Sequence, residues 1–411
     1  MIDIKKKEKE RAILIALSTG NFSRDQIEEH LDELELLTHT AGGEVVFKIM
    51  QERNSIDPAY YIGKGKAEEI AQLIELNDID LIIFDTDLNP TQVRNLEKLF
   101  VRKVLDRSGL ILDIFALHAR TRESKTQVEL AQLEYLLPRL TRAWTHLSKQ
   151  YGGIGTKGPG ETQIETDRRM VRTRISKLKE NLKKIEAQQK TKSAGRKEFL
   201  TATLVGYTNA GKSTLLNRLT NSDVLAEDKL FATLDSTTRS FEIEKNKKIL
   251  ISDTVGFIRK LPHNLVASFK STLNVVRDAD IILHVIDVSN EFFEDHMKVV
   301  EDTLNELESG KKIQIKIFNK IDALKSRDKI EIIADRYPYC LFISAQRGIG
   351  IPKLKEMLLE VYEKNYVTHK IELDHSNSKT ISKIYELAEV LEVVYEDAIV
   401  LLKYRTSAAN N

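Results

Sequence analysis

A phosphate-binding loop is the feature that most constrains the fold of this chain. The segment Thr201–Thr214 reads TATLVGYTNAGKST, an apolar run that leads into the pattern G-x-x-x-x-G-K-S. Gly206 and Gly211 let backbone N–H groups close around phosphate oxygens. Lys212 reaches the β- and γ-phosphates, and the Ser213 hydroxyl can bind Mg²⁺. Because the loop joins a strand to a helix whose positive end faces the phosphates, the sequence predicts an α/β domain with a doubly wound sheet.

Three further motifs follow in order, each at the end of an apolar segment. Asp253–Gly256 has the form D-x-x-G, in which the aspartate would hold Mg²⁺ through a water and the Gly256 amide would face the γ-phosphate. Asn319–Asp322 has the form N-K-x-D, and the Asp322 carboxylate can accept hydrogen bonds from guanine N1–H and N2–H₂. Ser344–Ala345 would direct a backbone amide at guanine O6. Since ligands of such sheets bind at the carboxyl ends of strands, the set predicts a guanine-nucleotide site.

The residue after D-x-x-G is unusual for a hydrolase. Phosphate-hydrolysing switches often place a glutamine there to orient the attacking water. Phe257 can neither donate nor accept a hydrogen bond. We therefore expect its ring to pack against apolar neighbours such as Ile258 or Leu261, and intrinsic hydrolysis to be slow.

Residue chemistry leaves two roles open. Thr233, Thr237 and Thr238 in LFATLDSTTRS are all candidate Mg²⁺ ligands. Asn209 could coordinate K⁺ beside the β- and γ-phosphates, or it could only make a local hydrogen bond that fixes the loop.

Four domains are predicted along the 411 residues. Residues 1–120 alternate apolar runs with amphipathic stretches, which predicts a small parallel sheet flanked by helices. Residues 121–198 predict a helical hairpin, and residues 199–365 form the nucleotide domain. Residues 366–411 predict a short α/β appendage, in which EVVYEDAIVLLKYR fits either a strand or a helix.

The predicted hairpin is antiparallel and strongly basic. Its helices are expected at Glu123–Tyr151 and Glu161–Lys190, joined by the glycine-rich tip Gly152–Gly160. Residues 139–198 contain 16 Lys/Arg and 6 Asp/Glu, whereas the whole chain has a net charge of only +1. This imbalance indicates a polyanionic partner, and the alternative is a solvated helical spacer.

Composition excludes several other classes of protein. The single cysteine, Cys340, cannot form a disulfide framework and fits a reducing compartment. The apolar run Ala12–Leu17 is too short for a signal peptide and predicts a first strand. No apolar run reaches the length of a membrane span, so we expect a cytoplasmic protein.

Specific segments of the chain resemble the HflX family of ribosome-associated GTPases, within the Obg–HflX group. The resemblance covers nearly the whole length, and its segments are YYIGKGKAEEI, ALHARTRESKTQVELAQLEYLLPRL, GGIGTKGPGETQIETDRR, GYTNAGKSTLLNRLT, FATLDSTTRSFEI, DTVGFIRKLPHNLVASFKSTL and NKID. It implies hydrolysis of GTP to GDP and phosphate, stimulated by the ribosome. It also implies a protein that binds the 50S subunit and its 23S rRNA, brings the hairpin tip to the peptidyl-transferase region, and dissociates stalled or stress-arrested 70S ribosomes. We expect the free protein to be a monomer.

The resemblance also implies roles for individual residues. The family's F-A-T-L-D switch maps to Phe231–Asp235, which favours Thr233 as the Mg²⁺ ligand beside Ser213, and Ser236 replaces a common proline. The catalytic candidates are Lys212, Thr233 and Gly256. The nucleotide-binding candidates are Gly206, Tyr207, Thr208, Asn209, Ala210, Gly211, Lys212, Ser213, Thr214, Phe231, Ala232, Thr233, Leu234, Asp235, Asp253, Thr254, Val255, Gly256, Asn319, Lys320, Ile321, Asp322, Ser344 and Ala345.

Two other functions remain compatible with the sequence. Members of the family are associated with ATP binding by the N-terminal domain, where Gly63–Lys66 (GKGK) is the one candidate motif. An ordinary strand-to-helix turn is the better explanation of this motif, because no second motif supports a site. Such a site would support ATP-dependent RNA remodelling. Alternatively, the protein could be a GTP-gated clamp that silences ribosomes without separating them.

Overall fold

The chain folds as two compact units in a computed structural model. The described residues are 9–140, 159–193, 199–220, 230–244, 247–260, 270–326, 328–364, 366–374, 377–396 and 399–407. The first unit consists of Met1–Glu186 together with two later segments, Glu227–Asp235 and Arg259–Ser271. The second unit consists of Ala187–Ala226, Ser236–Ile258 and Thr272–Asn411.

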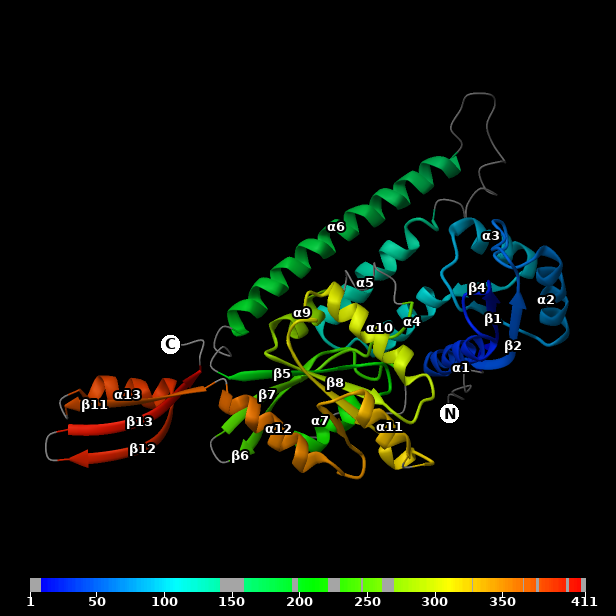
Figure 1. Cartoon of the computed structure of the whole chain (residues 1–411). Helices are drawn as coiled ribbons and strands as arrows, with labels where there is room; N and C mark the ends of the chain where they lie inside the picture. The colour runs from blue at the N-terminus through cyan, green and yellow to red at the C-terminus, as the bar shows by residue number, and fades with distance from the viewer. Residues whose placement is uncertain are drawn as a thin grey trace, which may run out of the picture. The chain divides into compact units, whose positions relative to one another are not determined.

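A four-stranded parallel sheet with strand order β2-β1-β3-β4 organises the first unit (Figure 1). Its elements are β1 (Arg11–Ser18), α1 (Arg24–Thr40), β2 (Glu44–Glu52), α2 (Lys64–Leu76), β3 (Leu81–Phe84), α3 (Pro90–Phe100), β4 (Lys103–Asp106) and α4 (Arg107–His118). The predicted α/β class of this part, including a first strand over Ala12–Leu17, is confirmed.

Local sequence explains where the helices of this unit begin. Asn89 accepts hydrogen bonds from the backbone N–H groups of Thr91 and Gln92, both at 2.9 Å, and Pro90 occupies the first helical position of α3. Asp106 caps α4 in the same way by accepting from the Gly109 N–H at 2.8 Å. Both caps fix the chain where it leaves the carboxyl ends of the strands.

The helical hairpin is present, but its first helix is shorter than predicted. The helix α5 (Arg122–Leu136) ends well before Tyr151, because Pro138 lacks the N–H that would continue it. The second helix, α6 (Pro159–Ser193), has 35 residues, which corresponds to roughly 50 Å. The two helices run in opposite directions (Figure 1) and share one apolar cluster, formed by Leu130, Ile175, Leu178 and Leu182. Of the predicted tip Gly152–Gly160, residues 152–158 lie outside the described residues, and the last two residues are helical because α6 begins at Pro159.

The second unit contains a six-stranded sheet with order β10-β9-β8-β5-β7-β6, parallel except for the pair β6 and β7. Its strands are β5 (Leu200–Gly206), β6 (Thr237–Glu244), β7 (Lys247–Asp253), β8 (Ile281–Asp287), β9 (Ile313–Asn319) and β10 (Cys340–Phe342). Its helices are α7 (Lys212–Thr220), α9 (Lys270–Asp278), α10 (Phe293–Glu306), η2 (Ile321–Ala323), α11 (Asp328–Arg336) and α12 (Ile351–Lys364). The predicted fold class of the nucleotide domain is therefore confirmed.

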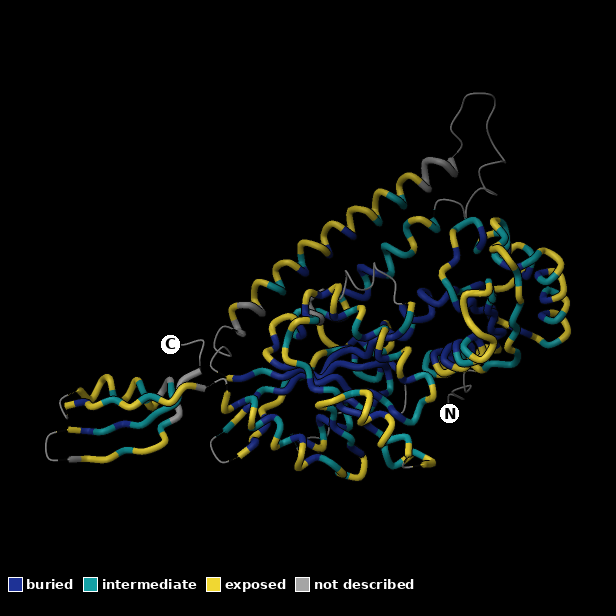
Figure 2. The backbone as a smooth tube through the Cα atoms, viewed as in Figure 1, coloured by how far each residue is buried: buried dark blue, intermediate teal, exposed yellow. Residues whose placement is uncertain are grey.

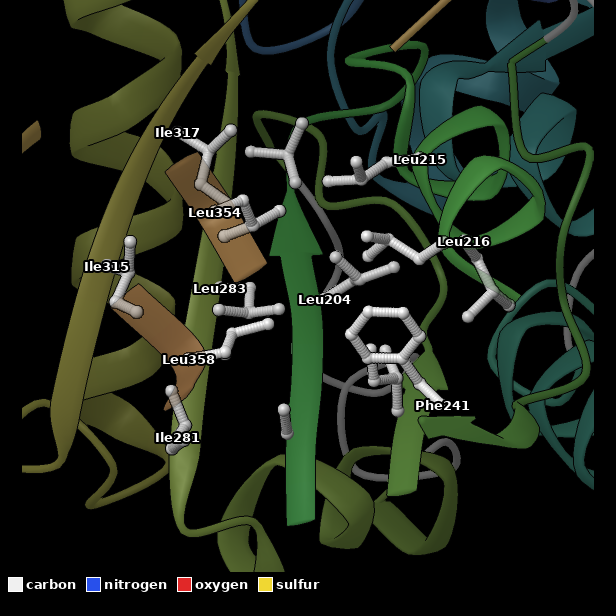
Figure 3. Packing of buried hydrophobic residues seen from close by; sticks show 14 of the residues in the cluster. Leu204, Leu215, Leu216, Phe241, Ile281, Leu283, Ile315, Ile317, Leu354 and Leu358 are labelled. Carbon is white, nitrogen blue, oxygen red and sulfur yellow. The ribbon is translucent and has the colours of Figure 1, made fainter. Parts of the chain in front are cut away.

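The core of this sheet positions the phosphate loop. Side chains from β5, β8 and β9 pack with residues of α7 and α12 in one buried cluster (Figure 3). The central strands are buried along their length, whereas α6 is largely exposed (Figure 2). A Cβ atom on Gly206 would lie 2.2 Å from the Val285 carbonyl oxygen, so only glycine permits this approach of β5 to β8.

A three-stranded antiparallel sheet, with order β11-β13-β12, forms the C-terminal part. Its elements are β11 (Tyr366–Asp374), α13 (Ser378–Leu387), β12 (Glu389–Glu396) and β13 (Ile399–Ser407). The segment that fitted either a helix or a strand is thus two strands, and Val400 and Leu402 are buried on alternate positions of β13. Among the described residues, no helix is long and apolar enough to cross a lipid bilayer.

His284 makes the stability of the second unit depend on pH. It lies on β8, is 1% exposed, and its Nδ1 has no hydrogen-bond partner among the described residues. Burial, together with the charges of Lys316 and Lys212, lowers the pKa of His284 to about 3. The unfolded chain would bind this proton near pH 6.5, so the contribution to stability is complete above that pH and is lost as the pH falls.

We expect His284→Gln to lose less stability in acid than the wild type. When the pH falls from 7.5 to 5.5, the free energy of unfolding of the wild type should decrease by about 1.4 kcal/mol more than that of the variant. Urea unfolding at the two pH values measures this difference. The buried His30, whose pKa is also lowered to about 3, is the same in both proteins and cancels. Equal losses would contradict the prediction.

Candidate nucleotide-binding site

The phosphate loop surrounds the ammonium group of Lys212. The Lys212 Nζ donates to the carbonyl oxygens of Gly206 at 3.1 Å and Tyr207 at 2.8 Å. Burial lowers the pKa of this lysine to about 8. The loop backbone therefore curves around the end of the side chain, in the arrangement expected for a group that contacts phosphate oxygens. Thr208 is also buried, and its hydroxyl has no partner among the described residues.

One buried side chain, Asn319, joins three of the predicted motifs. Its Nδ2 donates to the carbonyl oxygen of Ala210 at 2.9 Å, and its Oδ1 accepts from the N–H of Ala345 at 2.9 Å. Gly211 has a φ of +92°, and a Cβ atom there would lie 2.3 Å from Asn319 Nδ2. The phosphate loop, N-K-x-D and the Ser344–Ala345 turn are thus brought together, as the order of the motifs predicted.

The expected guanine-binding side chains lie on the same loops. Asp322 is 13% exposed at its side chain, and its Oδ2 lies 3.4 Å from the Nε of Arg347. Lys320 adopts a left-handed backbone conformation with φ of +64°, and its Nζ lies 2.7 Å from Asp287 Oδ2. The Ser344 Oγ accepts from the Arg347 N–H at 3.1 Å, which closes the turn. The Asp322 carboxylate is therefore mostly buried and pairs with Arg347, and its contact with a guanine base stays a prediction.

The D-x-x-G segment lies directly on the phosphate loop. Phe257 donates its N–H to the Gly206 carbonyl oxygen at 3.1 Å, and the Thr208 N–H donates to the Phe257 carbonyl oxygen at 2.8 Å. A Cβ atom on Gly256 would lie 2.8 Å from Thr208 Cα and 3.1 Å from Lys212 Nζ. Phe257 itself is 4% exposed, so its side chain is buried. Of the two neighbours predicted for its ring, Leu261 lies outside the described residues, and packing against Ile258 stays a prediction.

Two oxygen-bearing side chains of the second unit fit a Mg²⁺ ion. Ser213 Oγ donates to Asp253 Oδ2 at 2.7 Å, and hydroxyl and carboxylate oxygens are the ligands that Mg²⁺ prefers. Of the threonine candidates, Thr238 shares a hydrogen bond with the Ser252 hydroxyl at 2.8 Å, and Thr237 pairs with Asp253 in the β6–β7 ladder. Thr233 belongs to the first unit, so its role as a ligand stays a prediction. K⁺ binding by Asn209 stays a prediction as well.

Two residues of the F-A-T-L-D switch (Phe231–Asp235) make contacts that the sequence did not predict. Phe231 is buried, and its ring makes an edge contact with Phe115 of α4, with 4.8 Å between the ring centroids. Asp235 accepts from the Thr121 hydroxyl at 2.7 Å and from the Arg120 N–H at 3.1 Å. All four residues belong to the first unit. Both switch residues were predicted to contact nucleotide, and no local pattern indicates these partners.

The GKGK motif behaves as an ordinary strand-to-helix turn. Gly63 precedes α2, and its N–H donates to Gln51 Oε1 at 2.9 Å. Lys64 and Lys66 lie 3.7 Å and 2.7 Å from Glu68 and Glu69 of the same helix. These pairs favour the structural explanation of the motif over a nucleotide site.

Comparisons with known proteins agree with this geometry. The family model described as "GTP-binding GTPase N-terminal" matches residues 28–116, and "GTP-binding GTPase Middle Region" matches residues 118–196. The model described as "50S ribosome-binding GTPase" matches residues 201–320, which contain the phosphate loop and Asn319.

Curated relatives share most of the chain. The Escherichia coli protein named GTPase HflX is 43% identical over 400 residues, which cover 96% of this chain and 93% of that protein. The chain belongs to the HflX family of GTPases. The Flavobacterium psychrophilum GTPase HflX is 54% identical over 316 residues, 77% of this chain and 76% of that protein. A solved GTP-binding protein from Sulfolobus solfataricus, in complex with GDP, is 25% identical, covers 86% of this chain and 99% of its own, and has a TM-score of 0.45.

The base preference of this HflX GTPase provides a test of Asp322. In Asp322→Asn the amide places a donor where guanine also has a donor, so the affinity for GTP should fall by roughly 10- to 100-fold. The affinity for xanthosine triphosphate should rise, because its base offers an acceptor at that position. Competition binding with GTP and xanthosine triphosphate measures the change. Asp302→Asn, at an exposed aspartate of α10, is the matched control. An unchanged preference for GTP in Asp322→Asn would show that this carboxylate does not contact the base.

Proposed function

We propose that this GTPase binds the large ribosomal subunit and dissociates stalled or stress-arrested 70S ribosomes into subunits. The proposal rests on two features that occur in one chain. The guanine-nucleotide motifs are brought together by Asn319, and the basic helix α6 is long and largely exposed. The match of residues 201–320 to a 50S ribosome-binding GTPase model supports the choice of partner. Such a protein would act in the cytoplasm, on 23S rRNA of the 50S subunit.

In the proposed reaction, water attacks the γ-phosphate of GTP and releases GDP and phosphate. Lys212 would bind the β- and γ-phosphates, Ser213 and Thr233 would hold Mg²⁺, and the Gly256 amide would face the γ-phosphate. The bound Mg²⁺ would neutralise charge that develops on the phosphate oxygens. Because Phe257 is packed and cannot orient water, hydrolysis without a ribosome should be slow.

The basic face of α6 is the proposed contact with rRNA. Arg169 and Arg172 are exposed, whereas Arg174 forms a two-pronged pair with Glu129 of α5 at 2.6 and 2.9 Å. The predicted group of four arginines is Arg168, Arg169, Arg172 and Arg174. Arg174 is exposed but already paired with Glu129, and Arg168 is half-buried, which leaves Arg169 and Arg172 as the exposed members outside that pair. We assign RNA binding to Arg169 and Arg172.

Charge reversal at these two positions should weaken binding to 50S subunits and make it less dependent on salt. Each lost phosphate contact removes about one unit from the slope of log affinity against log salt, so Arg169→Glu with Arg172→Glu should reduce the slope by about 2. Binding to purified 50S subunits at several KCl concentrations measures the slope. The control is Lys298→Glu with Lys311→Glu, which changes the charge equally at exposed sites outside the hairpin. An unchanged slope in the hairpin variant would leave α6 a spacer.

Ribosome profiles test the function itself. With GTP or a non-hydrolysable analogue, the protein should convert 70S particles into 50S and 30S subunits on sucrose gradients, and 50S subunits should raise GTP turnover by at least about tenfold. Ribosomes that bind the protein but stay 70S would favour the silencing clamp. ATP-dependent unwinding that survives replacement of Lys212 would favour the RNA-remodelling alternative.

A further inference from the structure

Two basic residues that follow the D-x-x-G segment contact the N-terminal sheet. Arg259 Nε donates to Glu33 Oε2 at 2.5 Å, and its Nη2 donates to the His30 carbonyl oxygen at 3.0 Å. Lys260 Nζ donates to Asp85 Oδ2 at 2.7 Å and to the Asp85 carbonyl oxygen at 2.9 Å. All of these residues belong to the first unit, so the contact is internal to it.

The carboxylates that accept these hydrogen bonds are buried, and they are also bound by a third cation, Arg107. Glu33 and Asp85, the acidic pair, have side chains that are 6% and 5% exposed. Arg107, which is fully buried, donates to both carboxylates at 2.8 Å. Each carboxylate therefore keeps a second oxygen for Arg259 or Lys260. Burial would raise the pKa of Asp85, but the charges of Arg107, Arg259 and Lys260 hold it below its usual value.

This contact differs from an ordinary surface ion pair. Exposed pairs contribute little, whereas separating a buried pair leaves an uncompensated charge in a poorly solvated place. Without Arg259 and Lys260, the two carboxylates would lose these ion pairs and keep the shared contact with Arg107. Lys260 also keeps a left-handed backbone with φ of +53°, a conformation that residues with side chains adopt infrequently.

Chain continuity links the acidic pair to the nucleotide site. The backbone of Phe257 is hydrogen-bonded to the phosphate loop at Gly206 and Thr208. Only Ile258 separates Phe257 from Arg259. The segment that carries Gly256 is thus hydrogen-bonded to the phosphate loop through Phe257. Two residues later, Arg259 contacts the acidic pair.

We propose that Glu33 and Asp85 are positioning residues for the γ-phosphate-sensing segment, which they hold through Arg259 and Lys260. This rests on the role proposed above for Asp253–Gly256. GTP needs the Gly256 amide in place, whereas GDP has no γ-phosphate for it to contact. The acidic pair therefore strengthens GTP binding selectively, and a ligand or partner that disturbs the pair lowers the preference for GTP by the same coupling.

The first test compares two nucleotides on one variant. Arg259→Ala should weaken binding of a non-hydrolysable GTP analogue by about tenfold and of GDP by less than about twofold, within the usual range of coupling between sites. Fluorescent-nucleotide titration at equal Mg²⁺ measures both affinities. Arg277→Ala, at an exposed arginine of α9, should change neither. Arg259→Lys, which keeps the charge but donates from one nitrogen, should fall between the wild type and Arg259→Ala.

The second test approaches the same contact from the N-terminal side. Glu33→Gln keeps an amide oxygen for Arg107 but removes the charge that Arg259 contacts. It should reduce the preference for the GTP analogue as Arg259→Ala does, and the double variant should add little to either single change. Thermal melting identifies any variant that is simply unfolded. Glu28→Gln, an exposed position on the same helix α1, is the control.

Gly256→Ala separates failure of this proposal from failure of the site assignment. If the segment senses the γ-phosphate, Gly256→Ala loses the preference for the GTP analogue. If Gly256→Ala loses the preference for the GTP analogue over GDP but Arg259→Ala keeps it, only the positioning role is overturned. An unchanged preference in Gly256→Ala would overturn the site assignment and the positioning role together. Equal weakening of GDP and the analogue in folded Arg259→Ala would also overturn the positioning role.

Discussion

The amide of Asn319 is the interaction on which the nucleotide site depends. With one donor and one acceptor it joins the end of β9 to the phosphate loop and to the turn at Ala345. Each of these loops follows a different strand, so no local hydrogen bond could set their spacing. A buried amide is suited to this role because both of its polar groups must find partners. The absence of a side chain at Gly211 allows the loop to approach it closely.

The D-x-x-G segment is attached to the phosphate loop by main-chain hydrogen bonds, and the residues that follow it pair with Glu33 and Asp85. The Phe257 side chain itself is only buried. This explains how the chain accommodates phenylalanine directly after D-x-x-G. The residue continues the contact between the segment and the phosphate loop, while Arg259 and Lys260 provide the attachment that follows. A GTPase built in this way gives up a side chain that orients water. In the proposed scheme, Arg259 and Lys260 take over the positioning of the segment by contacting Glu33 and Asp85.

Local sequence predicted most of the fold because its signals are local in nature. The phosphate loop fixed the strand β5 and the helix α7, and Asn89 with Pro90 fixed the start of α3. The first hairpin helix was predicted too long, since apolar residues continue at helical spacing past Pro138 although the helix ends at Leu136. The C-terminal segment was ambiguous because short apolar runs fit both periodicities, and pairing with β11 decided the outcome.

The sequence by itself determined where the nucleotide motifs lie, and from them it predicted which residues face nucleotide, because phosphate and guanine recognition require particular groups at fixed spacing on consecutive strand ends. Tertiary structure alone decided what Arg259, Lys260, Phe231 and Asp235 contact. Arg259 and Glu33 are separated by 226 positions, and an ion pair between such residues leaves no period or motif in either segment. Burial makes the pair significant, and burial of a charge follows from the packing of whole elements around it.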